Sequence, residues 1–162
     1  MTVAAISTTP LVRGPVTGAD CARCPLAKNG QPQHPVAGEG PPDPAWVIVG
    51  EGPGGEELRT GRVFQGPSGR LVNKMLKAVG AARETLHVTN ASLCAPGPAT
   101  TDAQKTTAAA CCKPRLEIEL AQPALAGKPV LALGSVAMHV LLDTSLSITK
   151  IAGSYNLSQM GC

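Results

Sequence analysis

Aromatic residues are nearly absent from this chain, whose 162 residues include one Trp, one Tyr and one Phe. Any stacking on a nucleobase must therefore use a very short list of side chains. Charged residues make up only 15% of the chain. The net charge of +3 permits a nucleic-acid partner without requiring one, because Lys and Arg are not clustered along the sequence.

Long apolar runs and targeting signals are also missing. No run approaches the ~18 apolar residues of a membrane helix. The first residues lack the positively charged start and apolar core of a secretory signal. We therefore expect a cytoplasmic protein without a membrane partner. The length predicts a single domain over residues 1–162, with residues 1–18 as a loose arm, and we expect a monomer.

Cysteine, in contrast, is present in six copies. Disulfides are disfavoured in the cytosol, so metal binding or catalysis is the expected use. Cys21 and Cys24 form a CxxC pair that can hold one metal centre, and Cys94, Cys111 and Cys112 lie far along the chain. Four thiolates suit a 4Fe–4S cluster or a structural zinc, and spacing alone does not separate them. The alternative is that Cys94 and the adjacent pair are buried as small apolar residues.

The stretch from Trp46 to Gly80 organises the chain. Residues 47–49 predict a buried strand, and a glycine-rich turn follows over residues 50–55. Ligands of parallel sheets bind beyond the carboxyl ends of the strands, so this turn is a candidate site. A polar segment then leads into a helix that we expect Ser68 to cap, with one apolar face listed here: Leu71, Val72, Met75, Leu76 and Val79.

The turn also matches the G-x-G-x-x-G spacing of a phosphate-binding loop. That pattern is weak evidence here, because Pro53 removes a backbone donor and no helix is predicted to begin within the loop. A dinucleotide or P-loop site is therefore disfavoured.

Strands and helices alternate beyond this stretch. Residues 86–89 predict a second strand that ends at Asn90, and residues 130–133 predict a third, followed by a helix from Ser135. Between them, Asp102 is expected to cap a helix that Pro114 breaks or kinks, while residues 147–153 return to loop. This alternation predicts an α/β fold, a three-layer α/β/α sandwich around a parallel sheet.

Six segments, taken in order, resemble the family-four uracil-DNA glycosylases, which are the iron–sulfur members of the uracil-DNA glycosylase superfamily. They cover about residues 21–153 and read CARCPLA, VIVGEGPGGEELRTGRVFQGPSGRLVNKML, HVTNASLC, ACCKPRLEIEL, VLALGSVA and SITKIAG. The resemblance implies a uracil-DNA glycosylase-like fold with an N-terminal Fe–S arm. It also implies hydrolysis of the N-glycosidic bond of uracil in single- or double-stranded DNA, for base excision repair.

The resemblance assigns site residues by their matching positions. The four cluster ligands correspond to Cys21, Cys24, Cys94 and Cys112, with Cys112 preferred over Cys111 because the family's Cys-Arg-Pro aligns with Cys112-Lys113-Pro114. Gly50, Glu51 and Gly52 match the first catalytic motif, and Gly52 falls where other branches carry a water-activating Asp. Phe64 matches the aromatic that stacks on flipped uracil. Asn90 matches the amide that reads the uracil edge.

One family motif has no counterpart in these residues. The second catalytic motif is a His-Pro-Ser/Ala segment after a fourth strand, whose histidine stabilises the uracil anion, and the C-terminal part of the family domain that carries it is missing here. Two hypotheses follow. The chain is a uracil-DNA glycosylase with impaired activity, or it is a non-catalytic Fe–S nucleic-acid-binding module of the same fold.

Overall fold

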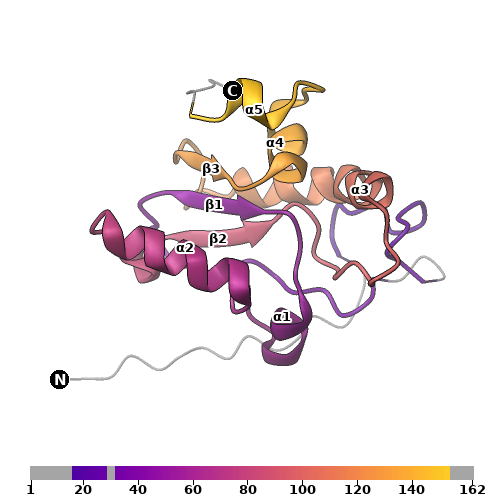
Figure 1. Cartoon of the computed structure of the whole chain (residues 1–162), viewed down its shortest axis with the longest axis horizontal. Helices are drawn as coiled ribbons and strands as arrows, with labels where there is room; N and C mark the ends of the chain where they lie inside the picture. The colour runs from indigo at the N-terminus through magenta and orange to yellow at the C-terminus, as the bar shows by residue number, and fades with distance from the viewer. Residues whose placement is uncertain (1–15, 29–31, 154–162) are drawn as a thin grey trace.

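A three-stranded, all-parallel sheet forms the centre of the protein (Figure 1). The computed structural model describes residues 16–28 and 32–153. In the strand order β2-β1-β3, β1 (Val47–Gly50) lies between β2 (His87–Asn90) and β3 (Val130–Ala132). The three predicted strands are confirmed to within one residue at each end.

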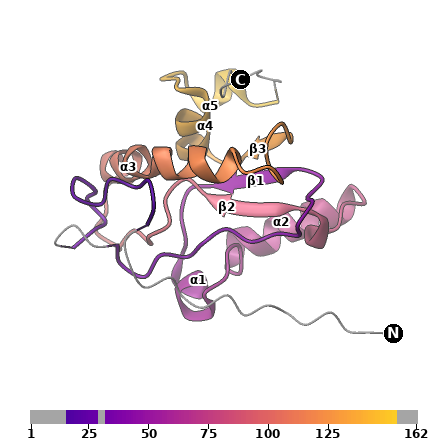
Figure 2. The same cartoon turned by 180° about the vertical axis from the view of Figure 1, so that it is seen from behind.

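Helices cover both faces of this sheet, as the two opposite views show (Figures 1 and 2). The helical elements are α1 (Gly55–Thr60), α2 (Pro67–Ala78), the 3-10 turn η1 (Arg83–Thr85), α3 (Asp102–Leu120), α4 (Ser135–Leu142) and α5 (Ile148–Ile151). Helices α3 and α4 lie on one side of the sheet, and α1 and α2 on the other. The predicted three-layer α/β/α arrangement is confirmed.

Strand β1 divides the core because its side chains alternate between the two faces. Val47 and Val49 pack with Leu116 of α3 and Val140 of α4 in one cluster. Ile48 packs in the other cluster, whose buried members also include Val36, Val63, Phe64, Leu76, Leu86 and Val88. All four residues of β1 are buried, as a strand covered on both faces requires.

Two predictions about the glycine-rich segment were wrong. A helix, α1, does begin within the loop at Gly55, because the Glu57 carboxylate accepts a hydrogen bond from the Gly54 N–H at 2.9 Å and satisfies that donor. The Gly54 N–H is therefore not free to bind a phosphate. Helix α2 is capped by Gly66 rather than Ser68, since Pro67 takes the first helical position, where its missing N–H costs nothing.

Helix α3 also differs from the prediction at two points. Its N-cap is Thr101, whose hydroxyl accepts from the Gln104 N–H while the Gln104 side chain accepts from the Thr101 N–H. The helix is not broken at Pro114, which was one of the two predicted outcomes, and it continues to Leu120. Proline removes one backbone hydrogen bond there, and the burial of Leu116 and Leu120 against the sheet offsets that loss.

The predicted apolar face of α2 is only partly buried. Leu76 packs into the core and Val72 against it. Leu71, Met75 and Val79, however, are 59%, 61% and 77% exposed. Residues 147–153, predicted as loop, contain the single turn α5. Within the described ranges, we find no helix with the length and apolar character that crossing a membrane requires.

Candidate base-recognition site and cysteine cluster

The candidate site lies at the carboxyl ends of two adjacent parallel strands. Gly50 ends β1 and Asn90 ends β2, and the two residues are direct neighbours in the strand pairing. Beyond this point the Ala91 N–H donates to the Gly50 carbonyl at 2.8 Å, and the Ser92 N–H donates to the Glu51 carbonyl at 3.0 Å. The predicted turn and the predicted strand-end amide are therefore held side by side.

Phe64 completes this corner although it lies between α1 and α2. A Cβ atom placed on Gly50 would lie 2.6 Å from Asn90 Oδ1 and 2.7 Å from Phe64 Cζ. The structure thus brings together three residues predicted for substrate binding, Gly50, Phe64 and Asn90. Phe64 is 8% exposed and Asn90 is 3% exposed, so both side chains are largely shielded from solvent.

The backbone of Phe64 adopts a left-handed conformation, with φ at 56°. Such a conformation is uncommon for a residue with a large side chain and is kept only when the surroundings enforce it. Gly69, in the first turn of α2, supplies one constraint, because its Cβ position lies 1.9 Å from the Phe64 carbonyl oxygen. Only glycine at this position lets α2 begin directly against Phe64.

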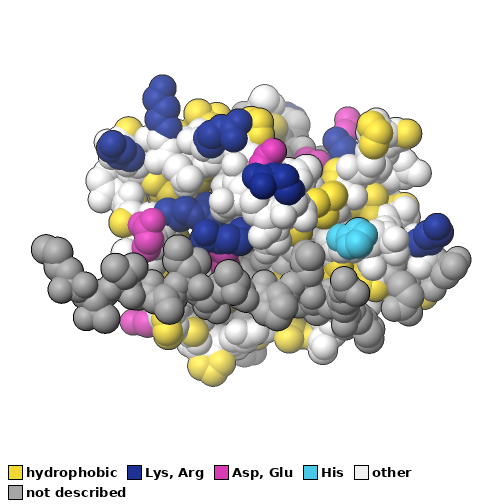
Figure 3. Space-filling view, turned by 90° about the horizontal axis from the view of Figure 1, so that it is seen from below, with side chains coloured by type: hydrophobic (Ala, Val, Ile, Leu, Met, Phe, Trp, Pro, Cys, Tyr) yellow, Lys and Arg dark blue, Asp and Glu magenta, His cyan; other side chains and the backbone are white. Residues whose placement is uncertain are grey.

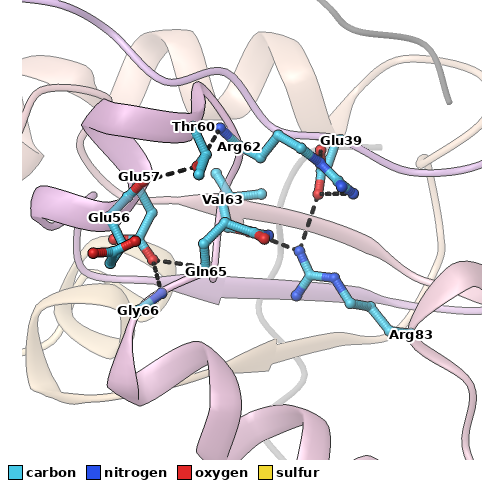
Figure 4. Close-up of polar contacts among 9 residues, drawn as sticks. All are labelled: Glu39, Glu56, Glu57, Thr60, Arg62, Val63, Gln65, Gly66 and Arg83. Carbon is cyan, nitrogen blue, oxygen red and sulfur yellow. Dashed lines mark hydrogen bonds and ion pairs between the residues drawn. The ribbon is translucent and has the colours of Figure 1, made fainter.

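Glu57 holds the segment that carries Phe64. Its Oε1 atom accepts from the N–H groups of Gln65 and Gly66, both at 2.7 Å (Figure 4). Its Oε2 atom accepts from the Gly54 N–H. Burial by itself would raise the pKa of Glu57, but these backbone donors hold that pKa below its usual value. One carboxylate therefore ties the glycine turn to the Phe64 segment.

Arg83 holds the same segment from the opposite side (Figure 4). Its Nη2 donates to the Val63 carbonyl at 2.7 Å and to Glu39 Oε1 at 3.0 Å. Arg62 also binds the Glu39 carboxylate, through Nε to Oε2 at 3.0 Å. Sequence reasoning missed Glu57, Arg83 and Glu39. A signal existed for Glu57, because an acid at the third position of a helix commonly returns to cap its start.

Replacing Glu57 with glutamine should destabilise the fold by about 1–3 kcal/mol at neutral pH, since hydrogen bonds to a charged acceptor are lost. A depressed pKa means that this stabilisation is present above the unfolded pKa of about 4.3 and is lost as pH falls through the folded value. The difference in unfolding free energy between wild type and Glu57→Gln should therefore narrow as pH falls below about 4.3. Urea unfolding at pH 7 and pH 3.5 measures it.

Glu56→Gln is the matched control, because Glu56 is exposed and pairs only with Arg59 on its own helix, at 2.8 Å. Such a pair contributes under about 1 kcal/mol. An equal loss for both variants at pH 7, or a gap as wide at pH 3.5 as at pH 7, would contradict the role given to Glu57.

Gly52 and Glu51 differ in their surroundings: there is no room for a side chain at Gly52, whereas the Glu51 side chain is partly exposed. A Cβ atom on Gly52 would lie 2.8 Å from Ser92 Oγ, so the place of a side chain here is already filled. An aspartate at position 52 would require Ser92 to move. The Glu51 side chain is 42% exposed, and its Oε1 lies 3.6 Å from Lys105 Nζ of α3. Lys105 and Ser92 were not anticipated as neighbours of the glycine turn.

The predicted cysteine ligands lie on three segments that meet beside α3. Residues 16–24 run along this helix, where the Asp20 N–H donates to the Cys111 carbonyl at 2.9 Å and the Cβ position of Gly18 lies 2.5 Å from Ile118 Cδ1. Cys94 and Cys112 are buried, whereas Cys21 and Cys24 are partly exposed. Cys111, the alternative to Cys112, is also partly exposed.

The thiols influence one another electrostatically. Burial raises the pKa of Cys94 to about 11, and the charges of Cys112, Cys24 and Cys21 act in the same direction. Burial likewise raises the pKa of Cys21, with added contributions from Cys112 and Cys24. The four predicted ligands are thus near enough to repel one another as thiolates, which a cationic centre would relieve. In residues 16–28 and 32–153, no three His, Cys, Asp or Glu side chains form a ready-made cage for one metal ion.

Basic side chains gather on the face of the molecule below the sheet (Figure 3). Helix α2 contributes Arg70, Lys74 and Lys77, all exposed, and has no acidic residue. The sequence suggested no such clustering, because these residues are spaced three and four apart and only a helix brings them to one side. Such a face favours a polyanionic partner.

Comparison with known proteins assigns the family. The family model described as Uracil DNA glycosylase superfamily matches residues 37–159. The chain belongs to this superfamily. Among curated relatives, the type-4 uracil-DNA glycosylase of Thermotoga maritima is 36% identical over 135 residues, which are 83% of this chain and 67% of the relative.

Two archaeal members of the superfamily give the same picture. The type-4 uracil-DNA glycosylases of Pyrobaculum aerophilum and Sulfurisphaera tokodaii are 32% and 31% identical, over 76% and 82% of this chain. This chain covers 60% of the length of each of these two relatives. The resemblance inferred from the ordered motifs is therefore confirmed, and the corner formed by Gly50, Phe64 and Asn90 lies inside the matched superfamily region.

Proposed function

We propose that this chain is a uracil-DNA glycosylase of the iron–sulfur type, which hydrolyses the N-glycosidic bond of uracil in DNA. The observation that carries the proposal is the meeting of Gly50, Phe64 and Asn90 at the carboxyl ends of adjacent strands. The resemblance assigns the base contacts to Phe64 and Asn90, and the first catalytic motif to the turn that begins at Gly50. The three residues come from segments separated by up to 40 positions in the sequence.

The corner offers the two kinds of contact that uracil recognition needs. A base must leave the duplex stack before its glycosidic bond can be reached, so it needs a new stacking partner. Phe64 is the one Phe of the chain. Uracil's edge presents both a donor and an acceptor, and the Asn90 carboxamide offers the complementary pair.

Bond cleavage leaves positive charge on the sugar and negative charge on the departing base. The Glu51 carboxylate is suited to the first charge or to orienting the attacking water, and its partial exposure leaves it accessible. The backbone N–H groups of Glu51 and Gly52 are suited to the second, whereas Pro53 has no N–H and the Gly54 N–H already donates to Glu57. Because Ser92 Oγ fills the side-chain position at Gly52, this chain relies on Glu51 and the backbone rather than on an aspartate base.

We further propose that Cys21, Cys24, Cys94 and Cys112 hold a 4Fe–4S cluster. The donor set fits, because soft thiolates are the usual ligands of such clusters, and the segment that carries Cys21 and Cys24 is bonded to α3 through the Asp20 N–H and the Cys111 carbonyl. A bound cluster would supply a cross-link between the N-terminal segment, the loop after β2 and α3. Zinc is the alternative occupant of the same thiols.

The function is tested by single-turnover release of uracil from single- and double-stranded DNA, beside a binding isotherm on the same strands. The expected result is release from uracil-containing DNA and none from the matched thymine-containing DNA. Preferential binding of uracil-containing DNA without release would leave a recognition module. No preference for uracil would overturn the proposal.

Replacing Phe64 with alanine should weaken binding of a uracil-containing single strand by about ten- to a hundredfold, because base–aromatic stacking contributes roughly 1–3 kcal/mol. Fluorescence anisotropy on labelled DNA measures the change. Binding of a strand without uracil is the control and should stay the same. Unchanged uracil binding with lowered thermal stability would make Phe64 a core residue only.

Protein purified without oxygen should be brown and contain iron and sulfide. Changing Cys24 to serine should remove most of the colour, since a hydroxyl is a poor replacement for a thiolate on iron. Iron, sulfide and zinc analysis with the visible spectrum gives the result. One zinc per chain in a colourless protein would replace the cluster assignment with a zinc site.

A further inference from the structure

Arg115 is buried beneath the proposed base-recognition corner and belongs to neither the cysteine set nor the base contacts. It lies on α3, three residues after Cys112, and is 6% exposed. Its Nη2 donates to the carbonyl of Asn90 at 2.7 Å and to the carbonyl of Ala91 at 3.2 Å. Arg115 thus binds the backbone at the end of β2, at the residue whose side chain is proposed to read uracil.

The charge of this arginine is balanced within the same buried layer. Arg115 Nη1 donates to Glu119 Oε2, one helical turn further along α3. Glu119 also binds β2, because its carboxylate contacts His87 Nε2 at 2.8 Å and accepts from Thr89 Oγ1 at 3.1 Å. Burial alone would raise the pKa of Glu119, but the His87 hydrogen bond and the Arg115 charge hold it below its usual value.

The two faces of β2 contact different parts of the protein. Successive strand side chains point to opposite faces, so His87 and Thr89 face α3 while Val88 and Asn90 face the other way. Val88 packs in the cluster that contains Phe64. The Arg115–Glu119 pair therefore binds β2 from the α3 side. These contacts hold the strand in the register in which the Asn90 carboxamide faces Phe64.

Simple packing does not account for an arginine here. Burying a guanidinium is costly even when it is paired, and Arg115 Nε has no hydrogen-bond partner among the described residues. The planar guanidinium serves three acceptors at a fixed spacing, because Nη2 donates to both carbonyls while Nη1 donates to Glu119. The single nitrogen of a lysine does not reproduce that spacing.

We propose that Arg115 is a positioning residue for uracil recognition, and that its bonds to the Asn90 and Ala91 carbonyls hold the Asn90 carboxamide in place against Phe64. This inference rests on the proposed function of Asn90. It assigns to Arg115 a part in base selectivity, exerted through the backbone and without contact with DNA.

The experiment compares Glu119→Gln with the double variant Arg115→Met/Glu119→Gln. Removing Arg115 alone would leave the Glu119 carboxylate buried without its cation and endanger folding. Glu119→Gln leaves the guanidinium on its two carbonyl acceptors and offers it a neutral amide oxygen in place of the carboxylate, and the double variant leaves neither charge. Both proteins are measured for iron content, for binding of matched uracil- and cytosine-containing single strands, and for hydrogen exchange of backbone amides.

The double variant should lose about tenfold in the preference for uracil over cytosine relative to Glu119→Gln. Cytosine-strand binding and iron content should stay the same. Arg115→Lys, which can keep one carbonyl bond, should fall between wild type and the Arg115→Met/Glu119→Gln double variant. An unchanged uracil preference, or a loss that only follows the loss of folded protein or iron, would overturn the positioning role.

Hydrogen exchange separates this inference from the proposed function. If the wild-type chain shows no preference for uracil, the proposed function fails, and the amides still test the role of Arg115. The Ala91 and Ser92 amides, which bind the Gly50 and Glu51 carbonyls, should exchange at least tenfold faster in the double variant. The Leu133 amide, bound to the Val49 carbonyl, is the internal control. Equal exchange at Ala91 and Ser92 in the two variants would refute the positioning role.

Discussion

Replacing Gly50 with alanine is expected to lower uracil release at least about 100-fold, because a displacement near 1 Å in a site of this kind costs about that much. The new methyl group would lie 2.6 Å from Asn90 Oδ1 and 2.7 Å from Phe64 Cζ. Both side chains are buried and cannot retreat into solvent. The substitution therefore displaces the two groups proposed to hold the base while adding a single carbon atom. Single-turnover release and uracil-strand binding measure the effect.

Gly55→Ala is the matched control on the same loop. No atom lies within 4 Å of the Cβ position at Gly55, and the residue begins α1, where alanine is favourable. This variant should release uracil like wild type. Circular dichroism and thermal unfolding of both proteins show whether Gly50→Ala remains folded. A folded Gly50→Ala protein with wild-type release would mean that the base binds elsewhere.

The second large effect is expected from the adjacent cysteines of α3. Cys112→Ser should lose nearly all bound iron, whereas Cys111→Ser should keep it. Cys112 is buried and acts electrostatically on both Cys94 and Cys21, which places it among the other proposed ligands. Cys111 is partly exposed, and its carbonyl binds the Asp20 N–H through the backbone, a contact that serine retains.

Iron and sulfide analysis of the two proteins, purified side by side without oxygen, gives the answer. The pair is its own control, since each variant changes one sulfur to oxygen on the same helix turn. Iron retained in Cys112→Ser and lost in Cys111→Ser would exchange the two assignments. Loss in both would mean that α3 itself must be intact to bind the cluster.

Much of the fold was predictable because its signals are local. The apolar run at Val47–Val49 and the strand-end position of Asn90 each depend on a few consecutive residues. The proposed base contacts were predictable for another reason. A family motif preserves residue types in order, so Phe64 and Asn90 were identified without knowing how they meet.

The predictions that were wrong concern positions where two local structures are acceptable and a neighbouring residue selects one of them. Ser68 is a reasonable cap in isolation, but Pro67 already occupies the first helical position and moves the cap to Gly66. Pro114 usually ends a helix, but burial of Leu116 and Leu120 continues this one. The apolar stripe of α2 predicts a core face, but only Leu76 and Val72 of that stripe pack against the core.

The residues that support the site could not be predicted from the sequence because their partners are distant along the chain. Arg83 binds the Val63 carbonyl and Glu39, and Arg115 binds the Asn90 carbonyl, over separations of 20, 44 and 25 positions. Nothing in the residue types announces such pairs. A lone arginine on a helix is usually a solvated charge.

The central position of β1 also has a consequence for how the chain acquires its structure. Val47 pairs with His87 on one side and with Val130 on the other, so neither neighbour is close in the sequence. Closing such long loops costs entropy before any contact compensates for it, and parallel sheets of this kind form slowly. While the chain is being synthesised, the most apolar strand must wait for partners made 40 and 83 residues later. We expect the local turns of α2 and α3 to form first, and the sheet to close last around β1.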